Sequence, residues 1–264
     1  MEFAGGKILA DVHDRVGLIT FNQPAKHNAI SVEMWAGLEE VLRSWQDDES
    51  VRVVVLAGAG EKSFVSGADI SQFEKLRGDA DAQREYDRLT RGGRDRLAAF
   101  PKPAIARIRG YCLGGGLAIA MMADLRIAAQ DSEFGIPAAR LGIAYGFENV
   151  RTLVSLVGPA HARMMLYGGA RIGSTEAERI GLVNRVVATE TLVEVVADLA
   201  RTIADNAPLS VRASKLTINQ ILRDPADRDM DAMARASAEC LNSEDYREGR
   251  TAFLEKRPPQ FRGR

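Results

Sequence analysis

Three consecutive glycines, Gly114, Gly115 and Gly116, form the part of this sequence best suited to chemistry. They follow a short apolar stretch and precede an alanine-rich apolar one, which predicts a strand, a tight turn and a helix. The first amides of a helix have no partner within it, and its dipole favours negative charge there. These amides could therefore stabilise a developing oxyanion or hold a phosphate. The alternative is a tight strand-to-helix joint without a ligand.

The spacing of these glycines excludes two familiar nucleotide motifs. The G-x-G-x-x-G spacing of dinucleotide-binding proteins is absent, and so is the G-x-x-x-x-G-K-[ST] phosphate loop. Other residues must therefore identify the ligand.

The segments around the glycines predict an α/β protein. Ala104–Arg109 and Leu125–Ala129 are the strands on either side, and Val51–Leu56 is β-branched and apolar enough to be buried on both faces. Lys7–Val12 and Val16–Phe21 predict a hairpin. Strands alternate with helices up to about residue 150, which indicates crossover units and parallel sheets.

Helices account for most of the remaining sequence. Ser31 is a suitable N-cap for a helix that carries Trp35, and the charged segment Gly78–Arg96 predicts an exposed helix or mobile lid with a weak point at Gly92-Gly93. We expect the tail Pro258–Arg264 to be ordered only where it lies on a neighbour. Further helices are predicted at 147–157, 159–167, 174–180, 191–206, 208–223, 225–240 and 243–256, with a strand at 183–187.

The composition limits the class of protein. The chain has 264 residues, enough for one large domain or one domain with a small appendage. Its 35 basic and 36 acidic residues give no reason to expect a nucleic-acid partner. Cys112 and Cys240 have no spacing typical of a metal site or a disulfide framework, so we expect no metal. No leader and no apolar run of membrane-spanning length is present, so we expect a cytoplasmic protein without a membrane partner.

Six stretches carry a recognisable pattern: Asn28–Ser31, Phe64–Ile70, Gly110–Gly116, Phe134–Pro137, Gly181–Val183 and Phe253–Arg257. In their order and spacing they resemble the enoyl-CoA hydratase/isomerase (crotonase) superfamily. The resemblance covers nearly the whole chain and implies a crotonase-like spiral of ββα turns with two near-perpendicular sheets. Residues 1–200 would form the spiral core with the acyl-CoA site, and 201–264 a helical region that makes homotrimers, often paired into hexamers.

This resemblance implies an enzyme that binds an acyl-CoA thioester and stabilises its enolate with the backbone amides of Ala68 and Gly115. The chemistry agrees, because two fixed N–H donors in a dry site stabilise charge on a thioester oxygen. Coenzyme A would be part of the substrate, and no separate cofactor is expected. The residues implied for the CoA moiety are Lys26, His27, Ala29, Ser66, Ala68, Asp69 and Ile70, with Phe253 and Lys256 of the same or a neighbouring subunit.

The sequence departs from the hydratases of this family at both catalytic glutamates. By alignment on the glycines these positions are Ala118 and Ala138, and a methyl group cannot transfer a proton. Tyr145 and Glu148 are polar residues beside the expected acyl pocket and are our other catalytic candidates. Tyr145 could instead be a packing residue, and Glu148 could serve the dipole of its own helix.

Several reactions fit this set of residues. Decarboxylation, in which a hydroxyl guides the carboxylate, is our first interpretation, and carbon–carbon cleavage or isomerisation remain open. A homologue that binds acyl-CoA or a partner protein without turnover is a second class. A related Clp-type peptidase would need a Ser-His-Asp set that no motif supplies.

Overall fold

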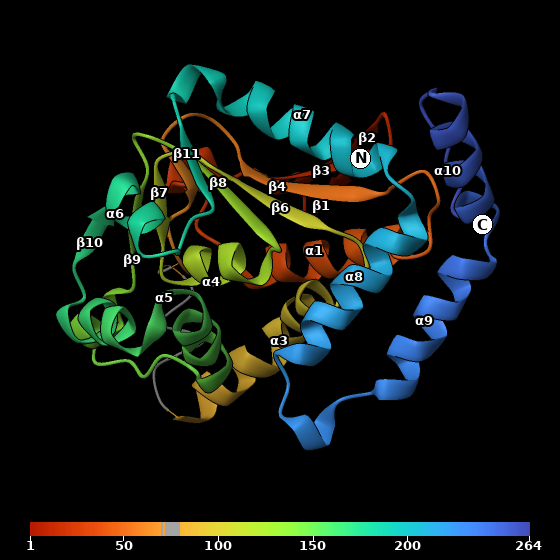
Figure 1. Cartoon of the computed structure of the whole chain (residues 1–264). Helices are drawn as coiled ribbons and strands as arrows, with labels where there is room; N and C mark the ends of the chain where they lie inside the picture. The colour runs from red at the N-terminus through yellow and green to blue at the C-terminus, as the bar shows by residue number, and fades with distance from the viewer. Residues whose placement is uncertain (70, 72–79) are drawn as a thin grey trace.

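The computed structural model describes residues 1–69, 71 and 80–264, with the backbone alone at 80, 82 and 83. The chain forms an α/β core of two sheets followed by a helical C-terminal region (Figure 1). The predicted fold class is therefore confirmed. The expected division at residues 200 and 201 falls inside helix α7 (Leu192–Asp205) and stays a prediction.

The larger sheet has the strand order β1-β2-β3-β4-β6-β8-β11 in the described residues. The hairpin of β2 and β3 is antiparallel as predicted, while β3, β4, β6, β8 and β11 run parallel. The strands are β1 Glu2–Phe3, β2 Ile8–His13, β3 Val16–Phe21, β4 Val53–Gly58, β6 Ala104–Ile108, β8 Leu125–Ala129 and β11 Arg185–Val187.

The smaller sheet has the order β10-β9-β7-β5 in the part of the chain described. Two of its strands pair in parallel with β7, so the segments before and after the glycines share one sheet. The strands are β5 Ser63–Val65, β7 Tyr111–Leu113, β9 Glu133–Gly135 and β10 Arg171–Gly173.

Helices cover both faces of the larger sheet. Helix α7 lies along one face, and α1 (Val32–Trp45) and α4 (Gly115–Met122) lie on the other (Figure 1). The strand residues divide accordingly, because successive side chains of a strand point to opposite faces. Val53 and Val55 pack in the cluster that contains α7, whereas Val54 and Leu56 pack in the main core.

Helix α3 (Ala80–Ala98) corrects the interpretation of the charged segment. It runs without a break through Gly92 and Gly93, and it packs along α1. A Cβ at Gly93 would lie 2.5 Å from the carbonyl oxygen of Trp35. The two glycines are therefore a place of close helix packing and not a weak point.

The C-terminal half is helical, as predicted. Helix α5 (Phe147–Gly168) is kinked at Gly158, where φ is 73°, and α9 begins at Met230, after a separate 3₁₀ turn at Pro225–Asp227. The remaining elements are α6 Ser174–Arg179, α8 Pro208–Ile221, α9 Met230–Asn242, α10 Glu244–Glu255, and the 3₁₀ turns Pro24–Lys26, Pro137–Leu141 and Thr189–Thr191.

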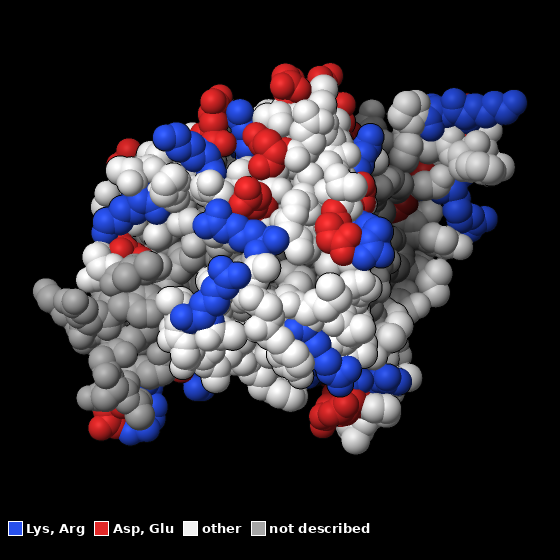
Figure 2. Space-filling view, turned by 90° about the vertical axis from the view of Figure 1, so that its left-hand side faces the viewer, with Lys and Arg blue, Asp and Glu red and all other residues white. Residues whose placement is uncertain are grey.

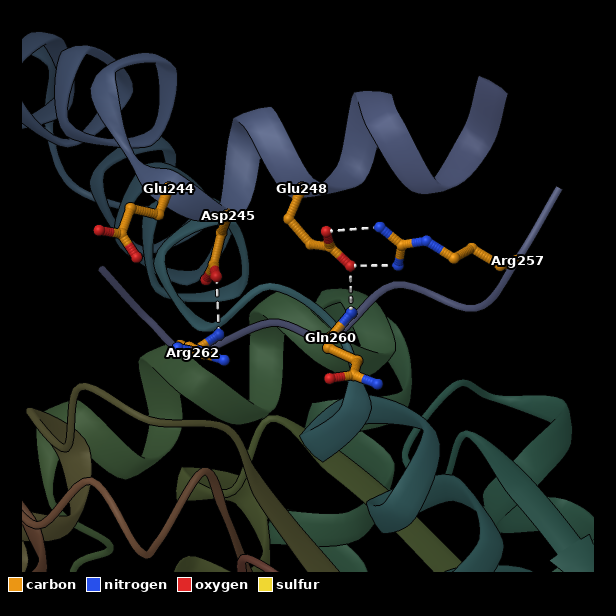
Figure 3. Close-up of a pocket in the computed structure, with 6 residues that line it drawn as sticks. All are labelled: Glu244, Asp245, Glu248, Arg257, Gln260 and Arg262. Atoms are coloured by element: carbon orange, nitrogen blue, oxygen red, sulfur yellow. Dashed lines mark hydrogen bonds and ion pairs between the residues drawn. The ribbon is translucent and has the colours of Figure 1, made fainter. Parts of the chain in front are cut away.

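The tail after α10 folds back on its own chain. The Glu248 carboxylate accepts hydrogen bonds from the Arg257 guanidinium at 2.6 and 2.9 Å and from the Gln260 amide at 2.8 Å (Figure 3). The Asp245 carboxylate accepts the amides of Arg262 and Gly263 at 2.6 and 2.7 Å. These bonds join the tail to its own chain, and the expectation that its order depends on a neighbour stays a prediction.

Charged side chains of both signs are interspersed over the face shown in Figure 2, as expected from the net charge of −1. Among the described residues we find no helix long and apolar enough to cross a membrane.

Candidate active site

The turn after β5 directs the amide of Ala68 away from the adjacent segment around Ile30. The carbonyl of Gly67 accepts the Ile30 amide at 2.8 Å, and the Asp69 amide donates to the Ile30 carbonyl at 2.9 Å. In such a parallel bridge the middle residue directs its own N–H to the opposite side. Gly67 has a φ of 127°, which a residue with a side chain rarely adopts, so glycine is required in this turn.

The glycine turn provides the second amide. The Gly114 amide donates to the Gly135 carbonyl at 2.9 Å, and Gly114 has a φ of 49°. Gly115 is the first residue of α4, so its amide has no acceptor within the helix. Gly116 lies against the backbone of Val65 and holds this turn on β5.

The two turns are in contact through Gly115. A Cβ at Gly115 would lie 3.5 Å from the amide nitrogen of Ala68 and 3.8 Å from Cγ2 of Ile30. Among residues 1–69, 71 and 80–264, no hydrogen bond uses the amide of Ala68 or of Gly115. The structure thus brings the two predicted donors together with both N–H groups free.

Tyr145 lies beside this pair. Its hydroxyl donates to the Gly114 carbonyl at 3.3 Å, the same oxygen that accepts the Ala118 amide of α4 at 3.0 Å. Burial raises the pKa of the Tyr145 hydroxyl, the nearby Cys112 acts in the same direction, and the positive charge of Arg94 opposes them. The hydroxyl is therefore protonated at neutral pH, and it donates its one proton to the Gly114 carbonyl.

We expect Tyr145→Phe to lower turnover at least tenfold, because the hydroxyl that fixes the glycine turn and faces the site is removed. The measurement is kcat and KM on the substrate found by the acyl-CoA panel described below, with Tyr167→Phe as the control because Tyr167 is 75% exposed. Unchanged kinetics would assign Tyr145 to packing alone.

The Lys26 ammonium and the Asp69 carboxylate form an ion pair at the edge of the Ala68 turn. Lys26 Nζ lies 2.8 Å from Asp69 Oδ2, and the carboxylate also accepts the amide of Ser71 at 3.0 Å. Burial acts to raise the pKa of Asp69, but the hydrogen bonds from Lys26 and Ser71 outweigh it and lower this pKa to about 2. Asp69 therefore holds the loop containing Lys26 on the Ala68 turn.

This ion pair predicts a pH-dependent contribution to stability. The pKa of Asp69 is lowered from 3.8 in the unfolded chain to about 2 in the folded one, so its contribution is complete above about pH 4 and is lost as the pH falls through 2. We expect Asp69→Asn to lower the free energy of unfolding at pH 7 and to have little effect near pH 2. Urea unfolding between pH 2 and pH 7 measures this change in the free energy of unfolding, with Asp224→Asn as a control at an exposed aspartate. An effect of Asp69→Asn that is independent of pH would refute the electrostatic origin.

The other residues implied for CoA binding fall into two groups. The His27 carbonyl accepts the Ser66 amide at 3.1 Å, the His27 ring packs edge-on against Tyr111 and Ala29 is buried, so these residues lie together beside the Ala68 turn. Phe253 and Lys256 lie instead at the end of α10, which Figure 1 shows far from α4. Phe253 is 83% exposed, and the role of these two residues in CoA binding stays a prediction. Ile70 lies outside the described residues.

The two positions at which the resemblance places catalytic glutamates lie beside the glycine turn. Ala118 is buried in α4, and Ala138 follows Pro137, whose Cδ would lie 3.9 Å from a Cβ at Gly114. Glu148 is 69% exposed, and its carboxylate lies 2.6 Å from the Arg151 guanidinium in the first turn of α5. This arrangement fits a favourable interaction of Glu148 with the dipole of α5. The catalytic role of Glu148 stays a prediction.

Arg94 is a residue near the site that the sequence analysis did not select. Its guanidinium lies over the rings of Trp35 and Tyr86, with centroids at 5.7 and 5.8 Å, and donates to the Thr90 hydroxyl at 2.5 Å. Its charge reaches the Tyr145 hydroxyl from α3. Nothing in the sequence distinguishes it from the other arginines of a charged helix.

Comparison with known proteins identifies the family. The enoyl-CoA hydratase/isomerase family profile matches residues 11–264. The chain belongs to the enoyl-CoA hydratase/isomerase family. It is 37% identical to the crotonyl-CoA hydratase of Syntrophomonas wolfei, over 96% of this chain and 97% of that protein. It is 36% identical to the short-chain-enoyl-CoA hydratase of Clostridium acetobutylicum, over 95% of each.

Solved structures of the enoyl-CoA hydratase/isomerase family agree with this fold. The structure of an enoyl-CoA hydratase/carnithine racemase from Magnetospirillum magneticum superposes with a TM-score of 0.93 at 35% identity, covering 98% of this chain and 96% of that one. A family protein from Hyphomonas neptunium superposes with a TM-score of 0.92 at 33% identity, covering 98% of each chain. The predicted crotonase fold is thus confirmed for this family member.

Proposed function

We propose that this enzyme stabilises the enolate of an acyl-CoA thioester between the amides of Ala68 and Gly115, and that it does so without a glutamate pair. The observation that carries the proposal is the contact between the two turns with both amides free. Each such donor lowers the free energy of the negative charge that develops on a thioester oxygen by about 2.7–4 kcal/mol.

Decarboxylation of a malonyl-type acyl-CoA is the reaction that these residues support best. The bond between the α-carbon and the carboxylate breaks, carbon dioxide leaves and the electron pair moves into the enolate held by the two amides. A proton from water then adds to the α-carbon. This reaction needs no group at Ala118 or Ala138 to activate water, and in it the Tyr145 hydroxyl would turn from the Gly114 carbonyl to the carboxylate of the substrate.

A panel of acyl-CoA substrates tests the proposed reaction. Malonyl-, methylmalonyl-, crotonyl- and 3-hydroxyacyl-CoA are each incubated with the enzyme, and the products are identified by mass spectrometry. We expect loss of carbon dioxide from a malonyl-type substrate and very slow hydration of crotonyl-CoA. Efficient hydration would refute our interpretation of the two alanines.

The two alanines also favour a second candidate, a homologue that binds acyl-CoA without turnover. Isothermal titration of the same acyl-CoAs separates the two. Binding without any product across the panel would favour the binding protein, whereas binding with product supports the enzyme. The expected trimer or hexamer is part of the proposal for either function, and sedimentation of the purified chain tests it.

A further inference from the structure

A small cavity lies at the ends of strands β4 and β6, beside the first residues of α7. Its volume is about 80 Å³, and Ser63, Arg107, Arg109 and Leu192 are among the residues that line it. This volume accommodates a few waters or one small ion, whereas sites for larger ligands span roughly 300–1,000 Å³.

Arg107 is the unpaired cation of this cavity. It is half-buried in β6, and in the described part of the chain its guanidinium has neither a hydrogen bond nor an ion pair. Burial lowers the pKa of Arg107, and no neighbouring charge counteracts this effect. The Arg107 nitrogens are not among the buried unbonded atoms of the described residues, so solvent reaches them and their donors are open to water or to an anion.

Two further polar groups at the cavity lack partners. Ser63 is 3% exposed, and its hydroxyl oxygen has no hydrogen-bond partner in the described residues. Nε of Arg109 is also buried without a hydrogen bond, although it lies 3.7 Å from Asp131 Oδ2, and Nη1 lies 3.2 Å from Glu61 Oε1. Buried polar atoms are nearly always bonded, so these groups indicate that the cavity holds water or a small polar ligand.

The cavity lies on the opposite face of the sheet from the candidate active site. Ile105 packs in the cluster with α7, whereas Ala106 and Ile108 pack in the main core with α4. Because residues alternate along a strand, Arg107 shares the face of Ile105, and Figure 1 shows α7 and α4 on the two sides of β6. A ligand here is therefore separate from an acyl-CoA at Ala68 and Gly115.

We propose that this cavity binds one small tetrahedral oxyanion of the phosphate type, free in solution. The Arg107 guanidinium supplies the charge and forked donors, and the Ser63 hydroxyl supplies a further donor. The start of α7, a helix of 14 residues, adds a favourable dipole. The Glu61 and Asp131 carboxylates engage Arg109, so these three side chains with Arg107 carry no net charge, and Arg107 is the cation among them that has no ion pair in the described residues.

Equilibrium dialysis with radiolabelled inorganic phosphate tests the proposal at fixed ionic strength set with chloride. We expect one phosphate per chain, at least tenfold weaker binding for Arg107→Gln and several-fold weaker binding for Ser63→Ala. The matched control is Arg43→Gln, which removes an exposed arginine of α1 and should change the dissociation constant less than twofold. Equal binding by the wild type, Arg107→Gln and Arg43→Gln would overturn the proposal.

Thermal unfolding gives a second readout that does not depend on the enzyme's reaction. Phosphate at ten times its dissociation constant should raise the Tm of the wild type by roughly 2–4 °C and leave that of Arg107→Gln unchanged. Without phosphate, Arg107→Gln should be as stable as the wild type or more so, because an unpaired half-buried charge is removed. The effect of phosphate should persist in saturating CoA, and competition between the two would contradict a separate site.

Discussion

Replacement of Gly115 by proline should reduce turnover about 100- to 1,000-fold while leaving the fold intact. Proline has no N–H, so this change removes one of the two donors to the enolate oxygen, which is worth about 2.7–4 kcal/mol in the transition state. Gly115 is the first residue of α4, a position where proline is favoured. The loss should therefore appear mainly in kcat, with the Tm close to that of the wild type, while the proline ring, which also adds a Cβ at this place, raises KM.

The variant Gly115→Ala provides a comparison that keeps the N–H. Its added methyl would lie 3.5 Å from the Ala68 nitrogen, an ordinary contact that permits folding but occupies the space between the donors. We expect a smaller loss of kcat together with a higher KM. Activity of Gly115→Pro within threefold of the wild type would show that the donors are misassigned.

Gly116→Ala, one residue further along, should instead destabilise the protein by at least about 3 kcal/mol. A Cβ at Gly116 would overlap the carbonyl oxygen of Val65 and lie 2.6 Å from its carbonyl carbon. Because the obstacle is the backbone of a buried strand, neither a rotamer change nor a small shift of a side chain relieves it. Urea unfolding monitored by circular dichroism measures the effect.

The matched control for this change is Gly168→Ala at the end of α5, where a Cβ would meet nothing within 4 Å. We expect that variant to be as stable as the wild type or slightly more stable, because alanine is a better helix former. Equal stability of the two variants would mean that β5 and α4 are not packed as described.

The regular elements could be predicted because their signals are local. Ser31 accepts the Met34 amide as an N-cap should, and the apolar run in β4 is buried on both faces. The strand β7 escaped prediction, because its three residues become a strand only through pairing with β5 and β9. Gly92 and Gly93 were misinterpreted for the same reason, since the close approach of α1 is a tertiary contact.

The residues of the candidate site also differ in whether a local sequence pattern predicts them. The turn containing Ala68 and the glycines before α4 carry recognisable sequence patterns, so the two donors could be named in advance. Arg94 and Arg107 could not, because a single arginine has no pattern and its role depends on which groups surround it in space. The contact of Tyr145 with the Gly114 carbonyl also joins residues 31 positions apart.

The placement of both donors on the main chain has an evolutionary consequence. Every residue except proline has a backbone N–H. A substitution at position 68 or 115 therefore seldom removes the donor to the oxyanion. Side chains around it can be exchanged while that element survives, as the alanines at 118 and 138 illustrate. A scaffold of this kind can keep its anion-stabilising element while a few lining residues change the reaction.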